Sequence, residues 1–247
     1  MGGGNHFAEV QRVEAVHDAR AFQTLKLETN QLLLLVHSGS RGLGEHILRA
    51  HVDRHGAGSL AEESAEARTY LARHDQAVGW ARANRAAIAE RVMRGVGAAG
   101  RRVLDVCHNS VTPKTWEGER GWLHRKGAAP SDQGPVVIPG SRGALSYPVL
   151  PLGDGEDHAH SLAHGAGRKW TRTHARERLR ERFTPRRSCA PPQEPRRVRG
   201  PRPALRGGPP AYKAIDRVVG DLVDAGLVRV VATLAPLLTY KTRSRRE

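Results

Sequence analysis

The sequence is poor in cysteine and contains no long apolar run. Its two cysteines, Cys107 and Cys189, make no disulfide framework, which favours a reducing compartment such as the cytoplasm. The longest apolar run, Leu32 to Val36, is far shorter than the roughly 20 residues that cross a bilayer. The N-terminal Met-Gly-Gly-Gly-Asn-His lacks the basic region and the apolar core of a signal peptide. We therefore expect a cytoplasmic protein without a membrane partner.

Aromatic and acidic residues are also scarce. The chain has 13 histidines but only 3 Phe, 4 Trp and 4 Tyr, which favours ligand-rich chemistry. The formal net charge is +15, and the stretch from Arg168 to Arg206 holds 14 Lys and Arg against 3 Asp and Glu. A localised basic tract is attracted to the phosphate backbone of nucleic acids, although a solvated linker has the same composition. Both interpretations of this tract are open.

The spacing of apolar residues predicts an α+β fold with a mixed β core and peripheral helices. Helices are expected at 66–96 and 211–225, where apolar residues recur every three, four and seven positions. Short apolar or alternating runs predict strands at 7–13, 31–36, 102–107, 122–126, 135–138 and 227–233. Because these elements follow no regular βαβ order, we assign the fold to the α+β class.

One segment fits neither pattern. Residues 186–209 contain six prolines and no apolar periodicity, which excludes a regular helix or strand. The segment is expected either to be a disordered basic arm or to come from a stretch of a GC-rich gene translated out of frame. We expect residues 1–185 to form the core and residues 210–247 to add a helix and a strand to the same domain.

Four histidines lie in glycine- or serine-rich turns. They are His6 after Gly-Gly-Gly-Asn, His37 before Ser-Gly-Ser-Arg-Gly, His108 in Cys-His-Asn-Ser, and His164 in His-Gly-Ala-Gly-Arg. An imidazole nitrogen binds a metal or a phosphoryl group, and the bare N–H groups of such turns bind phosphate oxygens. The four turns together favour a metal-dependent site that handles nucleotides or nucleic acid, provided that distant parts of the chain converge.

These turns, with three further segments, resemble the RtcB family of RNA ligases. The matching segments are Gly4–Phe7, His37–Gly42, Cys107–Asn109, Arg125–Ala128, Ile138–Ser141, His164–Arg168 and Tyr240–Lys241. The sequence around His37 and His108 is most similar to the branch of the family coupled to release factor H, for which RNA repair has been proposed. The resemblance implies joining of an RNA 3′-phosphate or 2′,3′-cyclic phosphate to a 5′-hydroxyl, in RNA repair or tRNA splicing. It also implies GTP and Mn²⁺ as cofactors, RNA as substrate and an archease-like activator.

The resemblance assigns expected roles to residues of this chain. His164 takes GMP as the nucleophile, since a neutral imidazole can attack the α-phosphorus of GTP. His6, His37 and His108 bind manganese, and Arg41 binds the terminal RNA phosphate. Guanylate binding is expected at Asn5, His6, Phe7, Ala8, Glu9, His108, Asn109, Pro139, Gly140, Ser141, Arg142, Ser146, His164, Gly165, Ala166, Gly167, Tyr212 and Lys241.

One departure from the family lowers the expected activity. Family members carry an Asp and a Cys well before the Gly-Asn-His segment, and here Met1 stands four residues before Asn5. We therefore expect a chain truncated at its N-terminus, with weak manganese binding and little ligase activity. The alternatives are a catalytically impaired homologue that only binds RNA, and a different metal enzyme such as a phosphohydrolase.

Overall fold

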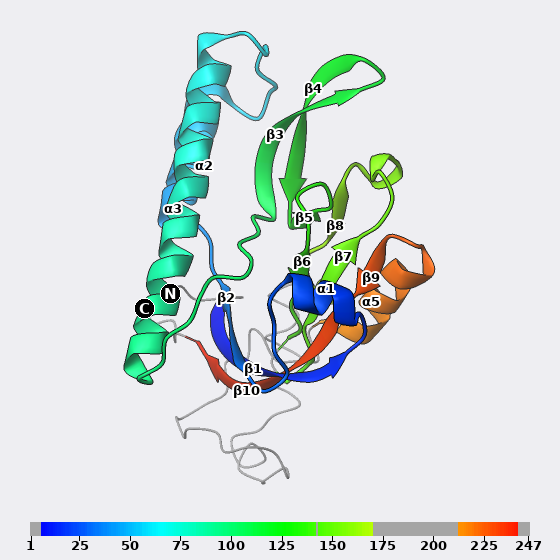
Figure 1. The fold of residues 1–247 in the computed structure, drawn as a ribbon. Helices are drawn as coiled ribbons and strands as arrows, with labels where there is room; N and C mark the ends of the chain where they lie inside the picture. The colour runs from blue at the N-terminus through cyan, green and yellow to red at the C-terminus, as the bar shows by residue number, and fades with distance from the viewer. Residues whose placement is uncertain (1–5, 142, 170–211, 242–247) are drawn as a thin grey trace.

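The computed structural model describes residues 6–141, 143–169 and 212–241 and has an α+β architecture (Figure 1). Its helices are α1 (Ala19–Thr24), α2 (Gly42–His55), α3 (Ala65–Gly95), the short 3₁₀ helix η1 (Glu156–His158) and α5 (Ile215–Asp224). Its strands are β1 (Phe7–Val16), β2 (Leu32–His37), β3 (Asn109–Trp116), β4 (Glu119–Lys126), β5 (Ala128–Pro130), β6 (Val136–Ile138), β7 (Tyr147–Pro151), β8 (Ser161–Ala163), β9 (Val228–Val230) and β10 (Ala232–Tyr240). The predicted fold class is confirmed.

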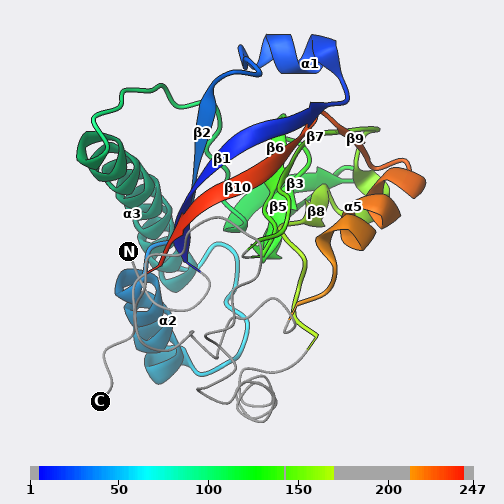
Figure 2. The ribbon, with the colours of Figure 1, turned by 90° about the horizontal axis from the view of Figure 1, so that it is seen from below.

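The longest strands form an antiparallel sheet in the order β10-β1-β2. Phe7 pairs with His37 across β1 and β2, and Ala8 pairs with Tyr240 across β1 and β10. Seen from below, this sheet runs between the α2–α3 helices and the side that holds α5 (Figure 2). The register therefore brings the start of β1, the end of β2 and the end of β10 to one place.

Three smaller sheets complete the β structure. β3 and β4 form a hairpin, β5 pairs with β8, and β6, β7 and β9 form the third sheet, all antiparallel. Val231 separates β9 from β10, because its N–H donates to the carbonyl of Pro148 while its carbonyl accepts from His17 and Asp18. The predicted strand 227–233 is thus two strands that belong to different sheets.

The long helix α3 confirms the prediction for 66–96. Its N-cap is Ser64, whose hydroxyl accepts a hydrogen bond from the Ala67 N–H at 3.0 Å. It buries a narrow stripe of small and branched side chains, Ala67, Ala81 and Ile88. Between Ala81 and Ile88, α3 carries the polar pair Asn84 and Arg85.

Among the residues that the structure describes, the apolar core has two clusters. One joins β6, β7, β9 and α5 around Val136, Ile138, Val149 and Val219, while the other joins α1 to the start of β10 around Phe22 and Val231. Burial of these side chains on folding stabilises the sheets from which the site loops emerge. Among the described helices, none combines the length and the apolar character that a bilayer crossing needs.

The expected strand at 102–107 is wrong. Within the described ranges these residues pair with no strand, and β3 begins only at Asn109. Side chains hold this segment instead, since Arg85 of α3 binds Asp105 and Cys107. The expected helix at 211–225 begins later, at Ile215, and the predicted strand 122–126 is the end of the longer β4. Residues 186–209 lie outside the described residues.

Candidate active site

The four histidines lie in one row. Ring centroids are 6.2 Å apart for His6 and His37, 5.1 Å for His37 and His108, and 4.7 Å for His108 and His164. The last two pairs are stacked, with interplanar angles of 21° and 18°. The predicted convergence of distant turns is therefore confirmed, although ring positions alone do not test the role of each histidine.

Sheet register explains why the row forms. His6 precedes β1 and His37 ends β2, and the Phe7 ring stacks on His37 at 5.5 Å. The His108 carbonyl accepts a hydrogen bond of 3.0 Å from the N–H of Ala128 in β5. Ala128 in turn pairs with Ala163 of β8, the residue before His164. Each imidazole thus stands at a strand end that antiparallel pairing fixes.

The environment keeps three of these imidazoles, those of His37, His108 and His164, neutral. Burial, followed by the charges of His108, His6, His164 and Arg85, lowers the pKa of His37 to about 3. Burial, followed by His164, Arg85 and His6, lowers the pKa of His108 to about 4. Burial also lowers the pKa of His164, against a hydrogen bond to the Gly127 backbone that acts in the opposite direction. Neutral rings retain the lone pair that metal binding or nucleophilic attack requires.

These depressed pKa values predict a dependence of stability on pH. In the unfolded chain histidine titrates near pH 6.5, whereas folded His37 and His108 stay neutral until about pH 3 and 4. Between these limits the unfolded state binds more protons, so the free energy of unfolding falls as pH drops below 6.5. Each histidine contributes up to about 1.4 kcal/mol per pH unit. Urea unfolding of the metal-free protein between pH 7.5 and pH 5 measures this.

A variant isolates the contribution of one ring from that of other titrating groups. His108→Gln cannot gain the proton, so its unfolding free energy should fall less steeply with decreasing pH than that of the wild type. Equal slopes for the two proteins between pH 6.5 and pH 5 would contradict the neutral state of His108.

Arg41 reaches the row from the start of α2. One of its terminal guanidinium nitrogens lies 2.7 Å from Nδ1 and 3.0 Å from Nε2 of His6. Its backbone has φ 61° and ψ −137°, a conformation that side chains other than glycine rarely adopt. Strain of this kind persists where the surrounding structure requires it, and here it directs an exposed cation toward the first histidine.

A buried polar network lies beneath the start of β1. Glu9 is 2% exposed and Gln11 and Ser146 are fully buried. The Gln11 amide donates to Glu9 Oε1 at 2.8 Å and to Ser146 Oγ at 2.9 Å, and the Thr239 hydroxyl donates to Glu9 Oε2. Gln11 was missed by sequence reasoning, although its position two residues after Glu9 on one strand puts both side chains on the same face.

The predicted nucleotide-binding loops lie together. The Gly140 N–H donates to Ser146 Oγ at 3.2 Å, and a Cβ at Gly140 would collide with the Leu145 carbonyl oxygen. A Cβ built on Gly165 would lie 3.5 Å from the carbonyl oxygen of Pro139, so the loop after His164 runs beside the loop of Pro139 to Ser141. Ala166 is buried in the core cluster. Asn5 and Arg142 lie outside the described residues.

The C-terminal residues return to the same place. Tyr212 forms a bridge with Arg168, whose guanidinium carbon lies 5.3 Å from the centre of the tyrosine ring. The Lys213 N–H donates to the Gly167 carbonyl at 3.2 Å. Lys241 directly follows β10, and its neighbour Tyr240 pairs with Ala8. Tyr212 and Lys241 therefore approach the His164 loop and the start of β1 respectively.

Comparison with known proteins identifies this arrangement. The family model described as "tRNA-splicing ligase RtcB" matches residues 1–242. The chain belongs to the RtcB family. It is 46% identical over 242 residues to "RNA-splicing ligase RtcB2" of Escherichia coli, covering 98% of this chain and 64% of the relative. It is 33% identical to "RNA-splicing ligase RtcB" of Mycobacterium tuberculosis, covering 96% and 63%, and 30% identical to "tRNA-splicing ligase RtcB" of Thermococcus kodakarensis, covering 96% and 58%. The chain thus spans less than two thirds of the length of these RtcB proteins.

In this RtcB chain, a pair of residues on α3 holds two of the histidine-bearing segments. Arg85 donates to the Ser38 carbonyl at 3.1 Å, to Asp105 Oδ1 at 2.6 Å and to Cys107 Sγ at 3.3 Å. Asn84 donates to Ser38 Oγ and to the Gly39 carbonyl, both at 3.0 Å. Ser38 follows His37 and Cys107 precedes His108, so α3 fixes both. No motif in the sequence marked this pair.

The ligand set for a metal is less complete than the RtcB resemblance implies. Imidazole nitrogen is a suitable donor for Mn²⁺. Across residues 6–141, 143–169 and 212–241, however, no three or more His, Cys, Asp and Glu side chains are arranged to hold a metal ion. Stacked imidazoles contact each other through their ring faces, whereas binding of one metal ion requires that a nitrogen of each ring points at the same position. The described structure therefore does not place His6, His37 and His108 as a complete set of manganese ligands. The Cys107 thiol accepts a hydrogen bond from Arg85.

Proposed function

We propose that this RtcB-family chain transfers GMP from GTP to His164 and uses it to join RNA ends. The ends would be a 3′-phosphate, or a 2′,3′-cyclic phosphate, and a 5′-hydroxyl. The observation that carries the proposal is the row of four imidazoles with His164 at its end, beside the turn that holds Gly165 and Gly167. A neutral, half-buried imidazole next to bare backbone N–H groups suits attack on a phosphate.

The first chemical step follows from the surroundings of His164. A hydrogen bond that raises the pKa of a histidine is one that the ring donates, so the ring nitrogen facing the Gly127 backbone keeps its hydrogen. The other nitrogen then carries the lone pair. It forms a bond to the α-phosphorus of GTP, the bond from that phosphorus to the bridging oxygen breaks, and pyrophosphate leaves. The Gly127 hydrogen bond stabilises the positive charge that the ring gains.

The remaining residues are proposed to bind the two substrates. Glu9 and Ser146, with Pro139 to Ser141, Tyr212 and Lys241, are proposed to bind the guanine nucleotide. Glu9 and Ser146 share one hydrogen-bond network with Gly140, Tyr212 lies at the His164 loop and Lys241 follows the strand paired with Ala8, and together they supply carboxylate, hydroxyl, aromatic and ammonium groups. Arg41 is suited to the RNA terminal phosphate, since a guanidinium fork matches phosphate oxygens. Mn²⁺ remains the proposed metal, and the incomplete ligand set supports weak binding. We further propose that RNA is the substrate, that an archease-like protein activates the enzyme and that the protein is located in the cytoplasm.

Covalent labelling tests this function directly. The protein is incubated with GTP radiolabelled at the α-phosphorus and with Mn²⁺, then denatured and resolved by gel electrophoresis. The expected result is a labelled band that survives alkali and is lost in acid, as a phosphoramidate should be. Hydrolysis of phosphoesters without such a band would instead support a phosphohydrolase. Salt-sensitive RNA binding without a band would support the RNA-binding homologue.

A further inference from the structure

Of the segment Arg125-Lys126-Gly127-Ala128, the proposed reaction uses only the backbone of Gly127. This segment ends β4 and begins β5, and it is one of the segments that resemble the RtcB family. Ala128 has two backbone partners that bear on the site: its N–H donates to the His108 carbonyl, and it pairs with Ala163. The segment therefore lies between two of the four histidines.

Gly127 is in direct contact with the His164 ring. A Cβ at this position would lie 2.9 Å from Cε1, 3.3 Å from Nδ1 and 3.6 Å from Nε2 of His164. The φ of Gly127 is +67°, a conformation that favours glycine. Its N–H donates to Asn109 Oδ1 at 2.7 Å, which fixes the peptide from the other side. The imidazole rests against a backbone surface that only glycine leaves open.

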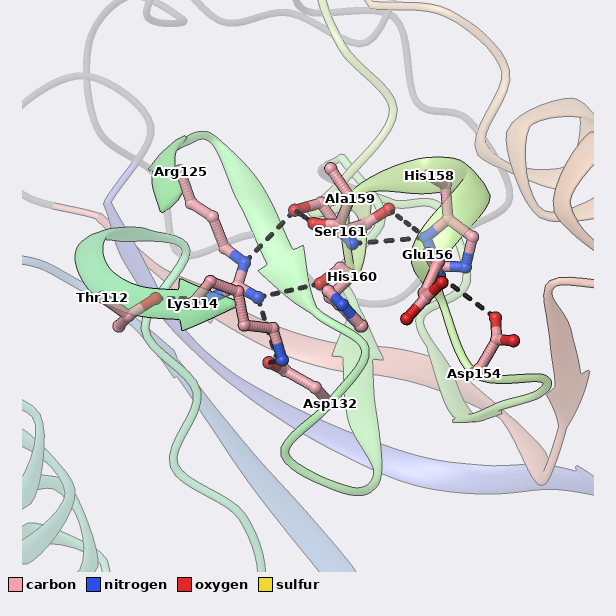
Figure 3. A network of polar contacts seen from close by, with 10 residues as sticks. All are labelled: Thr112, Lys114, Arg125, Asp132, Asp154, Glu156, His158, Ala159, His160 and Ser161. Carbon is pink, nitrogen blue, oxygen red and sulfur yellow. Dashed lines mark hydrogen bonds and ion pairs between the residues drawn. The ribbon is translucent and has the colours of Figure 1, made fainter. Parts of the chain in front are cut away.

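Arg125 holds the strand that leads to His164. Its side chain is 1% exposed, and each of its three guanidinium nitrogens donates to at least one acceptor (Figure 3). It donates to the His160 carbonyl at 3.0 Å and to Ser161 Oγ at 3.2 Å, at the start of β8. It also donates to Asp132 Oδ1 at 3.0 Å and to Thr112 Oγ1 at 3.4 Å. One buried guanidinium thus ties β3, β4 and the turn after β5 to the strand that ends one residue before His164.

We propose that Arg125 and Gly127 are positioning residues for the His164 nucleophile. Arg125 sets the place of β8, and Gly127 sets the orientation of the ring and which of its nitrogens carries the hydrogen. This inference rests on the proposed function, because it concerns GMP transfer to His164. A nucleophile displaced by about 1 Å loses about 100-fold in rate, so a small shift of the ring has a large effect on that step.

The test compares two glycines that both have a positive φ, Gly127 at +67° and Gly134 at +88°. Gly127→Ala introduces a methyl group against the His164 ring, whereas Gly134, with φ +88° and nothing within 4 Å of its Cβ position, has no such neighbour. Gly127→Ala is expected to slow formation of the GMP adduct about 100-fold while GTP affinity changes less than about twofold. Gly134→Ala, which also places a side chain on a backbone with positive φ, is expected to keep the wild-type rate. An unchanged rate in Gly127→Ala, or an equal loss in both variants, would overturn the proposal.

A spectroscopic measurement separates failure of this inference from failure of the proposed function. The ¹⁵N shifts of the His164 ring in the nucleotide-free protein report which nitrogen carries the hydrogen. Wild type and Gly134→Ala should share one pattern, and Gly127→Ala should lose it. If the wild type forms no adduct but these shifts differ as expected, the positioning role stands and the transfer reaction fails. Identical shifts in all three proteins would overturn the positioning role.

A conservative substitution tests Arg125. Arg125→Lys keeps the charge beside Asp132 but cannot reach all four acceptors, so the adduct should form about tenfold more slowly at saturating GTP. The thermal midpoint and the GTP affinity serve as readouts of a merely structural effect. A stable Arg125→Lys protein with a wild-type rate would remove Arg125 from the proposal.

Discussion

Replacing His164 with alanine should abolish the GMP adduct, a loss of at least about 1,000-fold. The ring lies 4.7 Å from His108 and touches the backbone of Gly127, and its pKa is lowered by burial. Removing the nucleophile leaves no bond to form at that position. Labelling with radioactive GTP measures the effect, and mass spectrometry of the wild-type adduct locates the modified residue.

The neighbouring histidines make this prediction a stringent one. His37 and His108 are also neutral at pH 7, because their pKa values are about 3 and 4. Protonation state therefore does not select the nucleophile. We propose that position does, since His164 lies at the end of the row, where the loop of Gly165 runs beside the loop of Pro139. An adduct that persists in His164→Ala, on His108 for example, would refute this assignment. His124→Ala, an exposed position on β4, serves as the matched control.

Replacing Arg85 with methionine should lower the free energy of unfolding by about 3 kcal/mol. The Arg85 and Asp105 side chains are 14% and 15% exposed, so the substitution leaves a carboxylate with little solvent and no cation. It also removes hydrogen bonds to the Ser38 carbonyl and to Cys107 Sγ. We expect the His37 and His108 rings to lose their stacked arrangement. Urea unfolding gives the stability, and the ring proton shifts of the two histidines give the arrangement.

Two further variants identify the cause of that loss. Arg82→Met removes an exposed arginine from the same helix and should change stability by less than about 0.5 kcal/mol. Combining Arg85→Met with Asp105→Asn should recover part of the stability, because the buried carboxylate is then neutral. The histidine shifts should remain altered in the double variant. If Arg85→Met is as stable as Arg82→Met, α3 does not hold these segments.

Local patterns were sufficient for elements that follow their own periodicity. The apolar spacing over residues 66–96 predicted a helix that the structure has at Ala65–Gly95. The run before His37 predicted β2, and the alternation after His6 predicted the first part of β1. The apolar face of a helix is made by residues three or four positions apart, and that of a strand by residues two positions apart. Both spacings are visible in the amino-acid sequence itself.

Elements that depend on distant partners could not be predicted in this way. The segment 102–107 alternates like a strand, yet Arg85 holds it through side chains. The apolar run at 227–233 divides at Val231, because two sheets compete for its backbone groups. Gln11, Asn84 and Arg85 have no local signature, since their partners lie in other elements. Their roles follow only from contacts between segments far apart in the sequence.

The amino-acid sequence by itself determined the α+β class, the family and the identity of the four histidines, because spacing and motif wording are properties of the chain. Only the tertiary structure decided that the four imidazoles lie in one row, that burial keeps those of His37, His108 and His164 neutral, and that Gly127 lies against the last ring while Arg125 binds the strand before it. The physical reason is that antiparallel strand pairing and buried polar contacts join residues that in some cases lie more than 200 positions apart in the sequence. No local pattern encodes contacts at such sequence separations.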